Sequence, residues 1–108
     1  MSKLKQYKMF IGGNWVDSET KKTFETLNPE NNKPWALVPE ASSKDVDDAV
    51  KAAHKAFEGE WPKLLPRERA KFLRAIGQKL RDNAELLGKV ETIDTGKLFR
   101  ETNKQANY

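Results

Sequence analysis

The residues best placed to do chemistry in this 108-residue chain are two carboxylates near its C-terminal end. Glu91 and Asp94 are three residues apart, so on a helix both carboxylates project from neighbouring positions of one face. The following Thr95, Gly96 and Lys97 are typical of a helix end, where a left-handed glycine stops the helix and a basic residue follows. Because no other polar group is available to form a cleft with the two acids, a structural role is a better prediction than acid/base catalysis.

Other residue types that could do chemistry are few. The absence of cysteine excludes disulfides, zinc–thiolate sites and a thiol nucleophile within these residues. His54, the only histidine, lies beside an apolar helical stripe and is predicted to be a partly exposed helix residue, not a base or a ligand. Gly12 and Gly13 have no helix after them, so they do not form a phosphate cradle.

Composition limits the class of protein. Charged residues make up 33% of the chain with both signs interspersed, which fits a folded protein better than a disordered one. No apolar run approaches the roughly 20 residues that span a bilayer, and the N-terminus lacks the apolar core of a secretory signal. These features predict a cytoplasmic protein without a membrane partner.

The first forty residues carry the strand and turn signals that must position any site. Residues 7–16 predict a hairpin with Gly12–Gly13 or Gly13–Asn14 in its turn, because the favoured two-residue turns need positive φ angles. Residues 23–38 predict a second hairpin, with alternation of period two before a turn rich in Asn and Pro. Pro39 is expected to end that strand or to place it at a sheet edge.

From Ser42 onward the apolar period changes from two to about 3.6, which predicts helices. Ser42 and Asp45 have the spacing of a capping box, and Gly59 is expected to close this first helix. Three further helices are predicted to begin at Pro66, at Asn83 and near Leu98. Because no sheet can be wound around these helices without more chain, the segment is expected to be a layer that packs onto a larger body.

Six short motifs follow one another in register between residues 7 and 108. They are FIGGNWV at 10–16, FETLNP at 24–29, VPEA at 38–41, DVDDAV at 45–50, RERA at 67–70 and ETIDTGK at 91–97. Together they resemble the N-terminal portion of the aldehyde dehydrogenase superfamily, in particular its betaine-aldehyde-dehydrogenase-like branch. Residues 1–6 lie outside the resemblance and are expected to form a flexible N-terminus.

The resemblance implies an α/β fold, in which two hairpins and three to four amphipathic helices form an incomplete N-terminal part (residues 7–108) of a Rossmann-like cofactor-binding domain. Family members are homo-oligomeric oxidoreductases that convert aldehydes to carboxylic acids with NAD or NADP through a cysteine thiolate. The chain contains neither that cysteine nor a glycine-rich cofactor loop. No catalytic or cofactor-binding residue is therefore assigned, and these residues alone are predicted to be inactive.

The resemblance also implies a site for K⁺ or Na⁺. In several family members a monovalent cation is bound by backbone carbonyls of a Thr-hydrophobic-Asn-Pro turn and by the aspartate of an Asp-x-Gly-Lys run. The matching positions are Thr26, Leu27 and Asp94. Carbonyl and carboxylate oxygens are the ligands that a hard cation prefers. The alternative is that Asp94 only hydrogen-bonds the turn at residues 26–28 and fixes hairpin to helix.

Two other functions stay open. The second predicted helix carries basic residues at helical spacing, which could follow a phosphate backbone: Arg67, Lys71, Arg74 and Arg81. No recognition motif accompanies them, and the nearby acids at positions 45, 47 and 48 could pair with them, so nucleic acid is not the predicted partner. The remaining alternative is a non-catalytic fragment that docks on an intact homologue through its apolar stripes.

Overall fold

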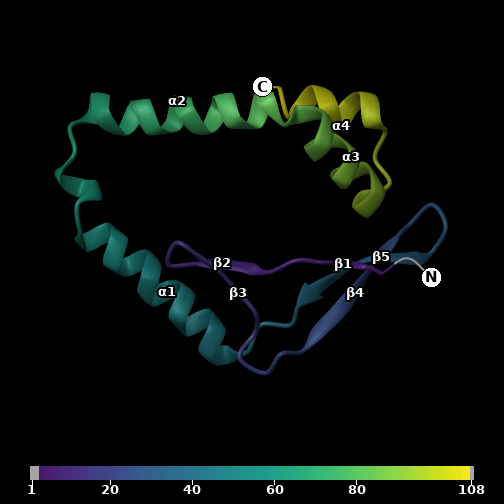
Figure 1. Cartoon of the computed structure of the whole chain (residues 1–108). Coiled ribbons are helices and arrows are strands. Elements are labelled where there is room, and N and C mark those ends of the chain that lie inside the picture. Colours follow the sequence, from purple (N-terminus) through teal and green to yellow (C-terminus); the bar gives the residue numbers. More distant parts are fainter. Residues whose placement is uncertain (1–2, 108) are drawn as a thin grey trace. The chain divides into compact units, whose positions relative to one another are not determined.

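The structure, a computed structural model, describes residues 3–107 and contains five strands and four α-helices in that range (Figure 1). The chain forms two compact units. The first consists of Met1–Thr26 with Pro34–Lys63, and the second of Leu27–Lys33 with Leu64–Tyr108. The order of paired strands followed by helices confirms the α/β prediction.

The first predicted hairpin is confirmed. β2 (Met9–Ile11) pairs antiparallel with β3 (Asn14–Val16) across a two-residue turn. Gly12 and Gly13 in that turn have φ angles of 58° and 83°. Positive φ at both central positions is the twist that joins two neighbouring strands most directly, and glycine reaches it without a steric penalty.

The second predicted hairpin is confirmed as well. β4 (Thr23–Asn28) and β5 (Lys33–Pro39) are hydrogen-bonded neighbours in a three-stranded sheet of order β1-β5-β4. β5 ends at Pro39, as expected for a residue that has no N–H to donate to a ladder.

A strand that the sequence pattern did not predict lies near the N-terminus. β1 (Lys5–Gln6) pairs in parallel with β5, with Lys5 opposite Ala36 and Gln6 opposite Leu37. The backbone N–H of Tyr7 extends this pairing by donating to the Leu37 carbonyl oxygen at 2.9 Å. These residues fall at the end of the segment for which a flexible N-terminus was expected. Two residues are too few to show a period, so only the hydrogen bonds to β5 define the strand.

The capping box at the start of α1 (Ser43–Glu58) is confirmed. The Asp45 N–H donates to Ser42 Oγ at 3.2 Å, and the Ser42 N–H donates to Asp45 Oδ2 at 2.8 Å. The Asp45 carboxylate also accepts the backbone N–H of Glu19, at 3.1 and 3.2 Å from its two oxygens. Asp45 is buried and thereby ties the loop after β3 to the helix. α1 is followed by Gly59 and by a short 3-10 helix, η1 (Trp61–Lys63).

In the second unit, α2 (Pro66–Asp82) begins at the predicted proline. The Glu68 carboxylate accepts the Leu65 N–H at 2.7 Å and so satisfies a donor that the helix leaves free at this end. Asn83 occupies the N-cap position of α3 (Ala84–Thr95), where the start of a helix was predicted, but its side chain makes no capping hydrogen bond there. Asn83 precedes α3, but its Nδ2 donates to the Lys79 carbonyl oxygen at 2.9 Å. Because only Asn83 separates the two helices, its side chain serves the end of α2.

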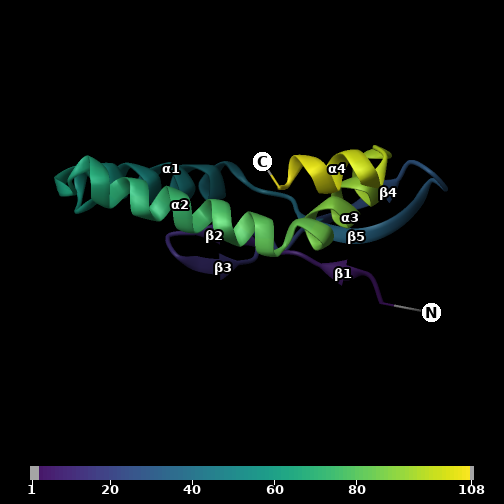
Figure 2. The same ribbon diagram turned by 90° about the horizontal axis from the view of Figure 1, so that it is seen from above.

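α3 and α4 (Phe99–Gln105) lie side by side (Figure 2). The fully buried Thr102 donates its hydroxyl to the Gly88 carbonyl oxygen at 2.9 Å, and its Oγ1 lies 3.0 Å from Thr92 Oγ1. A Cβ added at Gly88 would lie 2.9 Å from the Asn103 Cα. Glycine at this position therefore allows the two helix backbones to approach each other.

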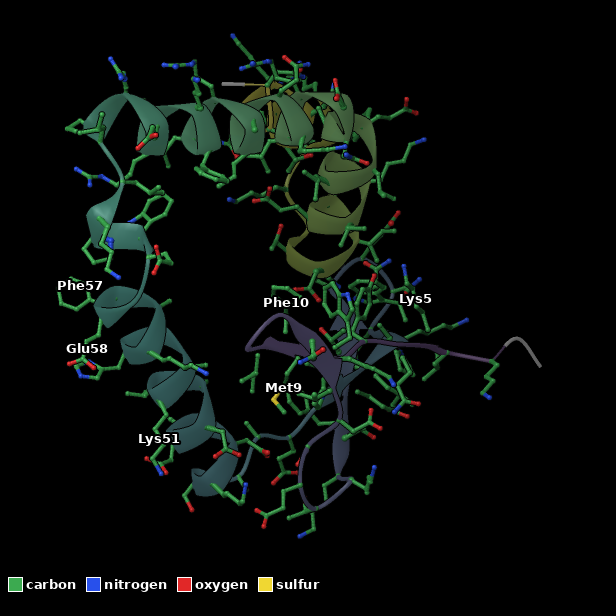
Figure 3. The ribbon with its side chains drawn as sticks, turned by 60° about the vertical axis from the view of Figure 1, so that its left-hand side comes forward. Lys5, Met9, Phe10, Lys51, Phe57 and Glu58 are labelled. Atoms are coloured by element: carbon green, nitrogen blue, oxygen red, sulfur yellow. The ribbon has the colours of Figure 1, made fainter. Side chains whose placement is uncertain are left out.

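The predicted apolar stripes exist, but they lie on the surface. Within residues 3–107, the buried hydrophobic residues are Ala36 and Ala84. Phe57 is 70% exposed and projects from α1 on the side away from β2 and β3 (Figure 3). Further exposed residues of the stripes are Val46, Val50, Leu73, Ile76, Leu80, Leu86, Leu87 and Ile93. The leucines and the isoleucine of α3 are thus exposed, because α3 buries little apolar surface in this part of the chain.

The environment of Asp45 predicts a pH-dependent contact between the loop and α1. The Ser42 and Glu19 backbone N–H groups hold the pKa of the Asp45 carboxyl below its ordinary value of 3.8. Because the folded pKa is lowered, the stabilisation is present above the ordinary value and is lost as the pH falls through the lowered pKa. In an NMR titration, the Glu19 amide resonance should therefore shift only below the ordinary pKa of aspartate.

The matched variants separate this contact from general charge effects. Asp45→Asn should abolish the acidic transition at the Glu19 amide. Asp47→Asn should keep it, because the exposed Asp47 carboxylate pairs with Lys51 at 2.6 Å. An unchanged transition in Asp45→Asn would contradict the assignment.

The close approach of α3 and α4 predicts opposite effects for two glycines. Gly88→Ala should force the helices apart and cost about 1–3 kcal/mol locally, because the new Cβ meets the Asn103 backbone. Gly77→Ala should be neutral or stabilise α2 by about 0.5–1 kcal/mol, because its nearest neighbour is the Arg81 guanidinium at 3.8 Å. Hydrogen exchange of the α3 and α4 amides measures the first effect and that of the α2 amides the second; equal protection of α3 and α4 in the two variants would contradict the packing.

Candidate functional site

The end of α3 has the geometry that its sequence predicts. Gly96 is left-handed, with φ 77° and ψ 5°, and its N–H donates to the Thr92 carbonyl oxygen at 2.9 Å. The Thr95 hydroxyl donates to the Glu91 carbonyl oxygen at 2.7 Å. Two of the carbonyls that a helix leaves without partners at this end are thus satisfied.

Glu91 is held in an ion pair across the glycine. Its Oε1 lies 2.9 Å from the Nζ of Lys97, and both side chains are partly exposed. The partner of Glu91 is therefore the basic residue that follows the helix, which agrees with a structural role at the helix end.

The tip of the second hairpin is an ordered turn built around Asn28. Its carbonyl oxygen accepts the N–H groups of Asn31 at 3.3 Å and Asn32 at 2.7 Å. Its side-chain Oδ1 accepts the Glu30 N–H at 2.9 Å. The left-handed φ of 56° at Asn32 closes the turn, a conformation that asparagine tolerates better than most residues.

This turn touches the end of α3 within the second unit. A Cβ added at Gly96 would lie 3.1 Å from the Pro29 Cγ, so any other residue there would press on the proline ring. We call this contact of Pro29 with Gly96 the hairpin–helix clasp. Of the predicted cation ligands, Leu27 precedes the turn and Asp94 precedes Gly96 in the second unit, whereas Thr26 belongs to the first unit.

The atoms with which these residues could bind a metal ion are all oxygens. They are the backbone carbonyls of Thr26 and Leu27 and the Asp94 carboxylate, a set that suits a hard cation and not a soft metal. Leu27 is 44% exposed, and Asp94 is exposed. Among residues 3–107 there is no group of three or more His, Asp or Glu side chains that could hold a metal ion.

The structure places His54 on the surface, as predicted. Its Nε2 lies 3.0 Å from Glu58 Oε1, and both side chains are 66% exposed.

The α1 acids, suggested as partners of the basic residues of α2, have local partners. Asp47 pairs with Lys51 and Asp48 with Lys44, both at 2.6 Å, and Asp45 accepts backbone N–H groups.

Comparisons with known proteins agree on one family. The model of the aldehyde dehydrogenase family matches residues 15–108. An aldehyde dehydrogenase of Aspergillus niger is 46% identical over 89 residues, which are 82% of this chain and 18% of the relative. Aldehyde dehydrogenase family 2 member C4 of Arabidopsis thaliana is 40% identical over 93% of this chain and 20% of the relative.

Solved structures show the same likeness. A betaine aldehyde dehydrogenase of Staphylococcus aureus in complex with NAD⁺ has a TM-score of 0.88 and 37% identity over 93% of this chain and 20% of its own. An NAD-dependent aldehyde dehydrogenase of Sinorhizobium meliloti has a TM-score of 0.93 and 28% identity over 97% of this chain and 21% of its own. The chain belongs to the aldehyde dehydrogenase family, and it spans about a fifth of the length of these relatives.

Helices that could cross a lipid bilayer were sought in the part of the chain that the structure describes, and none is both long enough and apolar enough.

Proposed function

We propose that this chain is the N-terminal portion of a subunit of an NAD- or NADP-dependent aldehyde dehydrogenase. The observation that carries the proposal is the family match over residues 15–108, together with 37% identity to an enzyme solved with NAD⁺. The whole protein would oxidise an aldehyde to a carboxylic acid. A 31% identical relative, 3,6-anhydro-L-galactose dehydrogenase, is solved with NADP, so both cofactors remain candidates.

The role of these residues in such an enzyme is structural. The sequence has no cysteine, so the nucleophile that the family uses is not among them. What they provide is two hairpins and amphipathic helices whose apolar faces are exposed, as on α1 and α2. Burial of these faces against the catalytic portion of the subunit would position that portion and keep water from it.

The proposal includes a cation at the hairpin–helix clasp. The Thr26 and Leu27 carbonyls and the Asp94 carboxylate would bind K⁺ or Na⁺ next to the hairpin tip at the end of α3. The Pro29–Gly96 contact supports this assignment, because it keeps the hairpin tip at the helix end. Further ligands would come from other parts of the subunit.

We also propose that the whole enzyme is a cytoplasmic homo-oligomer with a small aldehyde as substrate. The family resemblance supports both the assembly and the substrate. Without cysteine, these residues form no disulfide and need no oxidising compartment to fold.

A chimeric enzyme tests the structural role. The segment of the Staphylococcus aureus betaine aldehyde dehydrogenase that matches this chain would be replaced by residues 7–107, and NADH formation would be followed with betaine aldehyde. We expect activity within about tenfold of the host enzyme, because a scaffold that fits should add no more than about 1.4 kcal/mol to the barrier. The 108-residue chain alone should form no NADH.

Two controls interpret the chimera. A host enzyme that lacks the segment should be inactive. A chimera that carries Gly88→Val should lose activity together with its cooperative unfolding, since the larger side chain meets the α4 backbone. A chimera that folds and binds NAD⁺ but is inactive would contradict the proposal.

The cation is tested by the thermal stability of the same chimera. Replacement of choline chloride by KCl or NaCl at equal ionic strength should raise the unfolding midpoint, because a ligand that binds only the folded state stabilises it. Asp94→Asn should remove this rise, whereas Glu101→Gln, at an exposed acid of α4, should keep it. If Asp94→Asn lowers the midpoint equally in all three salts, Asp94 only hydrogen-bonds the turn.

A further inference from the structure

The net positive charge of the chain is concentrated in one helix. The whole sequence has 20 basic and 16 acidic residues, which gives a net charge of +4. α2 alone contains six basic residues and two acids, so the rest of the chain has fourteen of each and is neutral. α2 therefore has a net charge of +4, the highest of the four α-helices, and this charge is a feature of its surface.

The basic residues of α2 differ from those of the other helices in their partners. Lysines of α1 and α3 form ion pairs at 2.6 Å: Lys44 with Asp48, Lys51 with Asp47 and Lys89 with Glu85. Among residues 3–107, no ion pair involves a basic residue of α2. Arg81 instead donates to the amide oxygen of Gln78 at 3.0 Å. The charge of α2 is therefore not neutralised by this part of the chain.

These residues form one straight exposed stripe, which we call the basic seam: Arg67, Lys71, Arg74 and Arg81. Arg67, Lys71 and Arg74 are separated by four and three residues, and Gln78 continues this pattern toward Arg81. The average interval is 3.5 residues, which is the spacing of contacts between two α-helices that lie side by side. Nitrogen-ended side chains project together from one side of α2 in Figure 3. Glutamates at the same intervals on a second helix would face these cations along its length.

A nucleic acid fits the seam less well. Binding of single strands combines a basic groove with aromatic side chains on which bases stack. Phe72, the aromatic residue of α2, lies about 100° around the helix from Lys71 and so on another face. The residues at the border of the seam include Ala70 and Gly77, which are small enough for a second helix to approach closely.

We propose that the basic seam of α2 docks an acidic helix of a second polypeptide, with glutamate or aspartate at intervals of three and four residues. The interface is peripheral and electrostatic. It adds a protein-interaction surface to the structural role of the chain and does not depend on the catalytic proposal.

Fluorescence anisotropy tests the seam with defined probes. The labelled probe is a helical peptide of about 20 residues with glutamates at intervals of three and four and alanines elsewhere. The 108-residue chain should bind this peptide at low ionic strength, and the affinity should fall as salt is added. The triple variant Arg67→Gln, Lys71→Gln, Arg74→Gln should weaken binding about tenfold, because each exposed pair contributes a fraction of the total. Glutamine keeps the helix propensity of the residues that it replaces.

Matched controls decide the outcome. The control is a second triple variant, which removes the same charge from lysines that already have acidic partners: Lys44→Gln, Lys51→Gln, Lys89→Gln. It should change the affinity for the peptide less than about twofold. A peptide of the same composition with clustered glutamates should bind more weakly. The proposal would be overturned by equal weakening in both triple variants or by equal affinity for both peptides. It would also be overturned by tighter binding of a single-stranded RNA of equal charge, or by no binding of the peptide at low salt.

The source of the acidic helix is tested with the chimeric enzyme. If the remainder of the subunit covered the seam, the chimera would bind the peptide more weakly than the isolated chain and the proposal would be wrong. Equal binding by both proteins supports a second polypeptide.

Discussion

The left-handed conformation of Gly96 is the constraint on which the second unit depends. It ends α3 and directs the chain toward α4, and it lets Lys97 return to the Glu91 carboxylate at 2.9 Å. The missing side chain also leaves room for Pro29, which would otherwise be in contact with a Cβ at 3.1 Å. One residue without a Cβ therefore sets both the direction of the chain and the position of the hairpin tip.

A glycine without a side chain also allows α3 to pack closely on α4. Gly88 removes a side chain where the helices are closest, and Thr102 uses its hydroxyl to satisfy the Gly88 carbonyl in the buried interface. Elsewhere the helices keep their apolar faces exposed, as Phe57 and Leu73 illustrate. Local hydrogen bonds thus define the elements, while the hydrophobic burial that normally stabilises them is scarce within residues 3–107.

The charged side chains of the helices are distributed differently from the exposed apolar ones. Most basic residues of α1 and α3 are four residues from an acid, whereas α2 has a net charge of +4. The membership of the aldehyde dehydrogenase family accounts for the exposed apolar faces through the longer chains of its members, but not for the basic seam. The proposed partners of the two surfaces of α2 therefore differ in chemistry, one apolar and one acidic.

The sequence by itself determined the elements whose signals lie within a few residues of one another. The turn at Gly12, the capping box of Ser42 and the stop at Gly96 depend on φ preferences and hydrogen bonds over two to four residues, which local pattern records. Only the tertiary structure decided the pairing of β1 with β5, the hydrogen bonds from the Glu19 N–H to the Asp45 carboxylate and the close packing of Gly88 on Asn103. Those contacts join distant residues and are set by which surfaces meet in space, for which the chain carries no local pattern.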